Sequence, residues 1–160
     1  MVGQSGFYAT ILILLAAAPL AADSPREVLF PSDAVCYARA YSAQHLADHP
    51  VQRVSPIALR PEGAKVEDPA MLVWVTISFR DRPDEALEAL AYCQVQDSTR
   101  LGCIMEGDAG AFTIAAGKKG SALVSVEKAG MAFETATGFV TLRADAGDDR
   151  SFLLQPGPCP

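Results

Sequence analysis

The histidines His45 and His49 are the first candidates for chemistry in this chain, because they lie four residues apart. A helix would place both imidazoles on one face, in a geometry that can hold Zn²⁺ or Cu²⁺. Asp48 would add an oxygen ligand. The alternative is a solvated helical turn with incidental histidines, because so few ligands make a weak site. No glutamate follows His45, so the pattern lacks the HExxH motif of metalloproteases.

An acidic loop near the C-terminus is the second candidate. Asp145, Asp148 and Asp149 lie close together in the sequence and precede Arg150. Three carboxylates in one turn are able to coordinate Ca²⁺, although their spacing is not that of an EF-hand loop. Aspartates also shape turns and pair with arginine. We therefore keep two hypotheses for this loop, a calcium site and a turn formed by its aspartates.

Four cysteines, an even number, suggest two disulfides and an oxidising compartment. Cys93 and Cys103 flank a polar stretch suited to a hairpin loop. If these two cysteines face each other, Val95 lies opposite Leu101.

The other two cysteines are Cys36 and Cys159, which lie near the two ends of the chain that remains once the first 22 residues are set aside. A bond between them would join the first strand to the C-terminal tail. Four cysteines allow three connectivities. We favour Cys93–Cys103 with Cys36–Cys159, because a hairpin brings its two strands within the distance that a disulfide requires.

Other catalytic patterns are not indicated by the sequence. Both histidines belong to one short segment, and no glycine-rich phosphate motif follows a strand. We therefore expect neither enzymatic activity nor a cofactor. The net charge is −6, and the chain has no cluster of lysines and arginines, which argues against nucleic acid and anionic membranes as partners.

The first 22 residues have the composition of a secretory signal peptide. They contain no charged side chain, and an apolar run over 11–18 is followed by Pro19 and by small residues. We expect cleavage near Ala22, which leaves residues 23–160 as a single secreted domain. The cleaved protein would have no membrane span, because no later segment is apolar over the length that a helical span needs.

Period-two patterns dominate the mature chain and predict β-strands. The longest covers residues 71–80, and shorter ones follow at 121–127, 139–143 and 152–154. Closely spaced glycines leave no room for crossover helices, so we expect an antiparallel meander. The predicted fold class is all-β: a compact antiparallel barrel or sandwich of about eight strands, with one or two short helical turns and two disulfides.

Two segments have helical signals. Residues 42–50 would form a short helix, with Ser42 as N-cap and Pro50 as its end. Residues 83–90 begin with a proline and two acids, followed by good helix formers. Because this segment runs directly into Tyr92–Val95, which is typical of a strand, we expect a helical turn or irregular loop over 83–88 and a strand from about residue 89.

Several stretches resemble a family of small, uncharacterised exported bacterial proteins with two cysteine pairs. They are 36–37, 41–54, 92–93, 101–103, 106–112 and 147–154. The resemblance implies a shared periplasmic domain but no activity, so no functional residue is carried over. In size, compartment and β content the chain is also similar to periplasmic lysozyme inhibitors, which are small disulfide-bearing β-barrels.

Together these observations predict a non-catalytic periplasmic or secreted binding or interaction module. Its partner would be a periplasmic protein or a small ligand, and residues 42–50 and the acidic loops are the segments of interest. One alternative is an inhibitor of a cationic cell-wall hydrolase, because negative charge speeds encounter with a basic protein. The other is a metal-binding periplasmic protein that uses His45 and His49.

Overall fold

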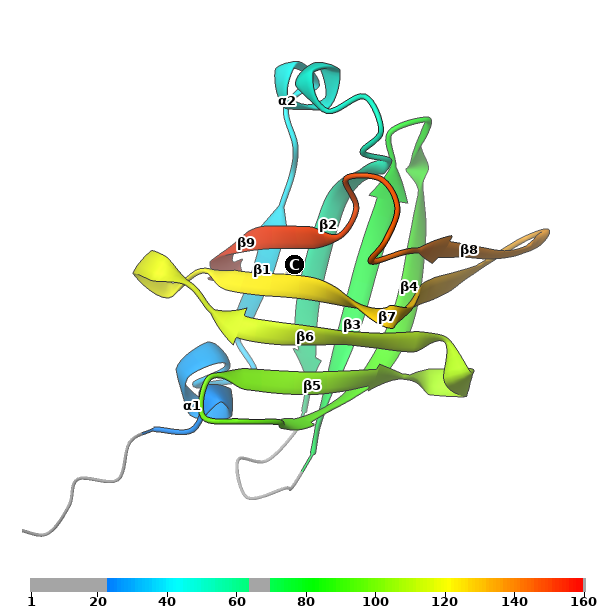
Figure 1. Ribbon diagram of the computed structural model, residues 1–160. Helices are drawn as coiled ribbons and strands as arrows, with labels where there is room; N and C mark the ends of the chain where they lie inside the picture. The colour runs from blue at the N-terminus through cyan, green and yellow to red at the C-terminus, as the bar shows by residue number, and fades with distance from the viewer. Residues whose placement is uncertain (1–22, 64–69, 160) are drawn as a thin grey trace, which may run out of the picture.

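The computed structural model describes residues 23–63 and 70–159, so the predicted signal peptide lies outside the described residues. Within these residues one antiparallel sheet contains nine strands (Figure 1). The strands are β1 (Val35–Arg39), β2 (Val54–Glu62), β3 (Met71–Phe79), β4 (Arg82–Val95), β5 (Arg100–Met105), β6 (Gly110–Ala116), β7 (Ala122–Thr135), β8 (Gly138–Leu142) and β9 (Ser151–Pro158). The helices are α1 (Pro25–Leu29) and α2 (Ala43–Asp48), with 3₁₀ turns η1 (Glu106–Asp108) and η2 (Lys118–Gly120).

The sheet closes on itself as a barrel. Its strand order is β6-β5-β4-β3-β2-β1-β9-β7-β8, and an additional pairing of β6 with β7 closes the ring. Eight strands therefore form the wall, and β8 extends it as a hairpin on the second half of β7. The all-β prediction is confirmed, and a continuous ring decides for the barrel over the sandwich. Strands β1 to β8 follow one another as a meander, and β9 returns between β7 and β1.

The barrel interior is filled by alternate side chains of the strands. In β3 the side chains of Met71, Val73, Val75 and Ile77 are buried, while those between them are partly exposed on the outside. The largest side chains that are fully buried include Phe112, Phe133 and Phe152. Each such side chain contributes about 1.5–3 kcal/mol through burial, so this interior is the main source of stability.

The segment 83–88 is not a helical turn or loop, contrary to the sequence-based prediction. It belongs to β4, which runs without interruption from Arg82 to Val95. Leu87 lies opposite Ile77 of β3 and is buried in the barrel, so tertiary packing outweighs local helix propensity. Pro83 is tolerated because β4 pairs with β5 only from Ala91 onward, which leaves its first half paired on one side.

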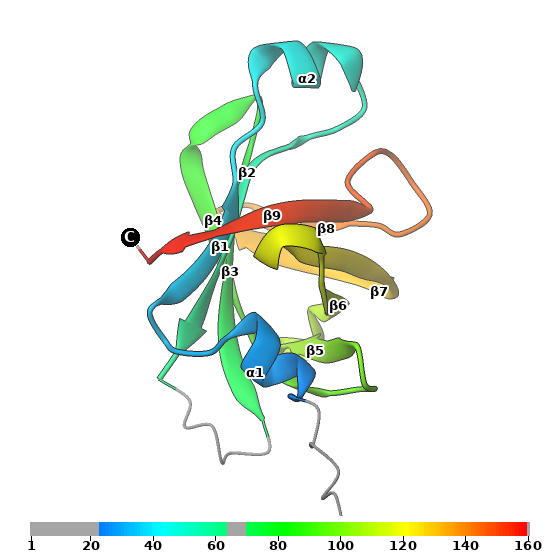
Figure 2. The same ribbon diagram turned by 90° about the vertical axis from the view of Figure 1, so that its left-hand side faces the viewer.

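Helix α1 closes one end of the barrel and was not predicted. Ser24 and Glu27 form a capping box, a signal that is visible in the sequence. Leu29 and Phe30 are buried, and the Tyr37 hydroxyl donates a 2.5 Å hydrogen bond to the Leu29 carbonyl. Burial of the Tyr37 side chain raises the pKa of its hydroxyl. Figure 2 shows α1 and α2 at opposite ends of the barrel.

Both disulfides have the predicted connectivity, Cys93–Cys103 and Cys36–Cys159. Val95 pairs with Leu101, as the hairpin register requires. Cys159 follows β9 directly and is bonded to β1, so the second disulfide joins the first and last strands. Two disulfides indicate an oxidising, extracellular compartment. None of the described helices has the length and apolar character needed to cross a membrane.

Candidate functional site

The short helix α2 stands away from the barrel on an arm formed by residues 41–52, which we call the α2 arm (Figures 1 and 2). The Ser42 hydroxyl accepts a hydrogen bond from the His45 N–H at 3.1 Å and caps the helix, as predicted. No side chain of α2 is buried. The helix is therefore held by polar and aromatic contacts and not by the core.

Three rings of the α2 arm form a stack. The Tyr41 and His45 rings have centroids 4.7 Å apart, and the His45 and His49 rings 4.4 Å, with interplanar angles of 28° and 23°. The guanidinium of Arg39 lies 5.2 Å from the centre of the Tyr41 ring. Spacing of four residues brings the rings together. The predicted histidine pair is thus placed face to face, not with its nitrogens directed toward a common point.

Gln52 fixes the orientation of the His45 ring. Its side chain is only 4% exposed, and its amide nitrogen donates to the Val54 carbonyl at 3.0 Å. The amide oxygen therefore faces His45 Nε2, also at 3.0 Å. Because an amide oxygen only accepts, His45 Nε2 must carry a hydrogen in this arrangement. That nitrogen has no lone pair available for a metal.

A cavity of about 340 Å³, which we call the histidine cavity, lies between the α2 arm and the start of β9. It is lined by Arg39, Tyr41, His45, His49, Gln52, Asp148, Arg150, Ser151 and Leu153. His49 Nδ1 lies 3.5 Å from an Asp148 carboxylate oxygen, so the arm is linked to the loop before β9. Among the hydrogen bonds of the described residues, none joins the Ser151 hydroxyl to a histidine.

The three aspartates of the predicted calcium loop have three different partners. Asp149 is buried and bonded to main-chain N–H groups at the start of β2. Asp145 is paired with Arg143, whose hydrogen bonds lower the pKa of the Asp145 carboxyl. Asp148 faces the α2 arm. Within residues 23–63 and 70–159 no group of three or more histidine, cysteine, aspartate or glutamate side chains is arranged to hold a metal ion.

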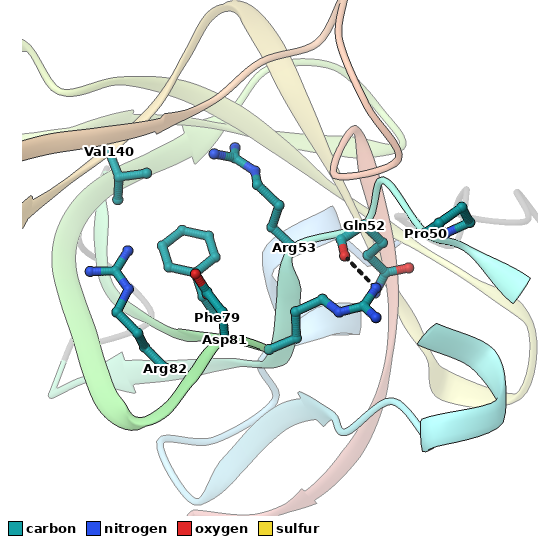
Figure 3. A pocket seen from close by; sticks show the side chains of 8 residues that line it. Pro50, Gln52, Arg53, Phe79, Asp81, Arg82 and Val140 are labelled. Carbon is teal, nitrogen blue, oxygen red and sulfur yellow. Dashed lines mark hydrogen bonds between the residues drawn. The ribbon is translucent and has the colours of Figure 1, made fainter. Parts of the chain in front are cut away.

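A second cavity of about 340 Å³ lies between the end of the α2 arm and the turn that joins β3 to β4 (Figure 3). We call it the arginine cavity. It is lined by Pro50, Gln52, Arg53, Phe79, Arg80, Asp81, Arg82 and Val140. This site was not predicted, because Arg53 is distant in sequence from the other two arginines and no basic run is formed. The available signal is Arg80-Asp81-Arg82, at the end of the strand predicted over 71–80.

Arg80 attaches the arm to the barrel at this cavity. Its Nη1 donates to the carbonyl oxygens of Leu46 at 3.0 Å and of Gln52 at 3.4 Å. Gln52 lines both cavities, so the two hollows adjoin at a buried amide. The end of the barrel that carries α2 thus presents arginine, histidine and tyrosine side chains around two neighbouring cavities.

Comparison with protein-family models, with curated proteins and with solved structures finds no match to this chain.

Proposed function

We propose that this protein is a non-catalytic binding module, exported to the periplasm or secreted, that takes its ligand at the α2 end of the barrel. One observation carries the proposal: the α2 arm has a helix with no buried side chain, yet it is held by a cap, a ring stack and the Arg80 bonds. The helix adds no buried side chain, and the arm that carries it lines two cavities, which is typical of a binding site.

Export is supported by two independent features of the chain. The first 22 residues have the composition of a signal peptide, and the domain carries two disulfides. A ligand of this module would therefore be met outside the cytoplasm.

The cavities favour a small molecule, or single side chains of a larger partner. Each has a volume of about 340 Å³, near the lower limit for sites that bind small ligands. Their walls combine aromatic rings, guanidinium groups and amides, which provide directional recognition. Recognition of such a ligand is the function that these walls favour.

A fragment titration followed by ¹⁵N NMR tests the proposal. We expect the shifted amides to lie at 41–53, 79–82 and 148–153. Leu153 and Leu123 provide a matched pair of variants, because they are cross-strand neighbours and both exposed, but only Leu153 lines the histidine cavity. Leu153→Trp should weaken binding there and Leu123→Trp should not. Shifts centred elsewhere on the barrel would refute the proposal.

An inhibitor of a cationic hydrolase is the second candidate, and one observation favours it. A cavity of about 330 Å³ on the barrel wall is lined by Glu88, Glu106 and Glu134 together with the aromatic side chains of Trp74 and Phe139. Carboxylates beside aromatic rings attract basic side chains. In a cell-wall turbidity assay with lysozyme, an inhibitor would preserve turbidity, and Gln at the three glutamates would abolish that protection. Absence of protection by the wild type removes this candidate.

A further inference from the structure

The arginine cavity holds two guanidinium groups against one aromatic ring. The Cζ atoms of Arg53 and Arg82 lie 5.4 and 5.5 Å from the centre of the Phe79 ring, which is itself 3% exposed. Figure 3 shows the two side chains on either side of this ring at the mouth of the cavity. Both arginines line the same cavity, so an anion inside it would be attracted by two positive charges.

Each of these guanidinium groups keeps unused hydrogen-bond donors. Arg53 donates from Nε to Asp149 and from one Nη to the Thr141 carbonyl, and Arg82 donates from one Nη to Glu85. An arginine has five N–H donors, so several on each side chain have no partner among the described residues. Guanidinium groups recognise carboxylate and phosphate oxygens through pairs of such donors.

An external anion would compete with the carboxylates around the cavity for the two arginines. Asp149 is buried and accepts hydrogen bonds from main-chain N–H groups and from Arg53 Nε, so it pairs with one edge of the Arg53 guanidinium and leaves that group's remaining Nη–H donors to an external anion. The Arg82–Glu85 pair is exposed on both sides, and such pairs are weak. Asp81 lines the cavity and opposes an anion. Glu85 is therefore a competing carboxylate on Arg82 that a better-placed oxyanion can displace.

We infer that the arginine cavity binds an oxyanion group, a carboxylate or a phosphate, of a small ligand, with Arg53 and Arg82 as its donors. This inference rests on the proposed function, since it names the ligand class of the same end of the barrel. Arg80 and Gln52 form part of the cavity wall, and Arg80 holds this wall to the α2 arm through its bonds to main-chain carbonyls.

The test is a titration of the mature, oxidised protein with acetate, with its neutral isostere acetamide, and with inorganic phosphate. Binding is followed by the Nε–H signals of the arginines and the amides of residues 79–82. We expect saturable shifts with acetate or phosphate and weaker ones with acetamide. The tighter of the two anions identifies the carboxylate or the phosphate as the group that the cavity prefers.

Matched variants locate the binding. Arg82→Gln should weaken anion binding about tenfold, the effect of losing a charge-assisted hydrogen bond. Arg100→Gln is the control, because Arg100 forms a similar exposed pair with Asp97 outside this cavity. Glu85→Gln should strengthen binding, since it removes the competing carboxylate. Melting curves of each variant would verify that the fold is intact.

The outcomes separate the two proposals. If acetamide shifts the cavity signals as strongly as acetate, or if Arg100→Gln weakens anion binding as much as Arg82→Gln, the oxyanion inference is wrong and the binding module stands. If none of the three probes and no fragment perturbs the α2 end, both proposals fail.

Discussion

The Asp149 carboxylate accepts a hydrogen bond from the Val54 main-chain N–H at 3.0 Å, although 95 residues separate the two in the chain. The same carboxylate accepts from the Arg53 N–H at 3.0 Å and from Arg53 Nε at 3.3 Å. The side chain is 2% exposed. This contact fastens the loop before β9 to the start of β2, and it holds Arg53 in position at the arginine cavity.

Replacing Asp149 by Asn should lower the free energy of unfolding by about 2–4 kcal/mol, because a buried acceptor is lost and N–H donors are left unpaired. Urea unfolding of the oxidised protein measures this. Asp145→Asn is the control, since the Arg143–Asp145 pair is exposed and its loss should change stability far less. Equal effects of both variants would contradict the buried contact.

The two disulfides should differ in their contributions to stability. Cys36–Cys159 closes a loop with a sequence separation of 123, and Cys93–Cys103 one of 10. On the chain-entropy model these loops correspond to about 5 and about 3 kcal/mol. The double variant C36A/C159A should therefore lose more stability in urea unfolding than C93A/C103A. The reverse order would show that local strain or packing outweighs loop entropy.

Much of the fold could be predicted because its signals are local. The alternation over 71–79 predicted β3, and the polar stretch between Cys93 and Cys103 predicted both the hairpin and its register. The first half of β4 could not be predicted in this way. Its strand conformation depends on Leu87 packing beside Ile77 of β3 in the barrel interior, whereas the composition of 83–90 by itself favours a helix.

The contacts of the candidate site were harder to predict from local sequence than the strands were. The helix 43–48 and its Ser42 cap were predicted, and so was the proximity of His45 and His49. The partners of that segment were not, because Gln52 lies beyond the helix and Asp148 is distant in sequence. Arg53 and Arg82 come together because Phe79 of β3 pairs with Val54 of β2 and with Arg82 of β4, and the pairing of β2 with β3 joins segments that are distant in sequence.

Gly110 should be irreplaceable at the bulge where β6 meets β7. Its φ is +108°, and a Cβ there would lie 2.0 Å from the carbonyl oxygen of Gly130. Gly110→Ala should lower the free energy of unfolding by about 3 kcal/mol or more, through strain and steric overlap. Gly157→Ala is the control, because no atom lies within 4 Å of its Cβ position. Similar unfolding curves for both variants would refute the close approach.

Zinc should leave the melting temperature unchanged if the histidine stack is not a metal site. Any ion that binds the folded state tightly must raise its stability. His45 Nε2 is bonded to Gln52, and the two imidazoles lie face to face. Thermal unfolding with excess Zn²⁺ or Cu²⁺ measures the effect. An increase in wild type that is absent from the double variant H45N/H49N would establish the metal-binding alternative.

Asp97 should make the stability of the protein depend on pH in the acidic range. The Thr99 hydroxyl and N–H and the Arg100 side chain donate to this carboxylate, and these bonds lower the pKa of Asp97 to about 2. A carboxyl with a lowered pKa stabilises the folded state at any pH above its unfolded value of about 4. That contribution is lost as the pH falls from about 4 to about 2.

Asp97→Asn removes this contribution, so the variant should be less stable than wild type at pH 7, and the difference should shrink between pH 4 and pH 2.5. Urea unfolding at these three pH values measures it. Thr99→Val should show a smaller version of the same effect, because it removes the largest single cause and leaves Arg100 in place. A difference between Asp97→Asn and wild type that stays constant down to pH 2.5 would mean that this hairpin loop does not hold the carboxylate in its charged form.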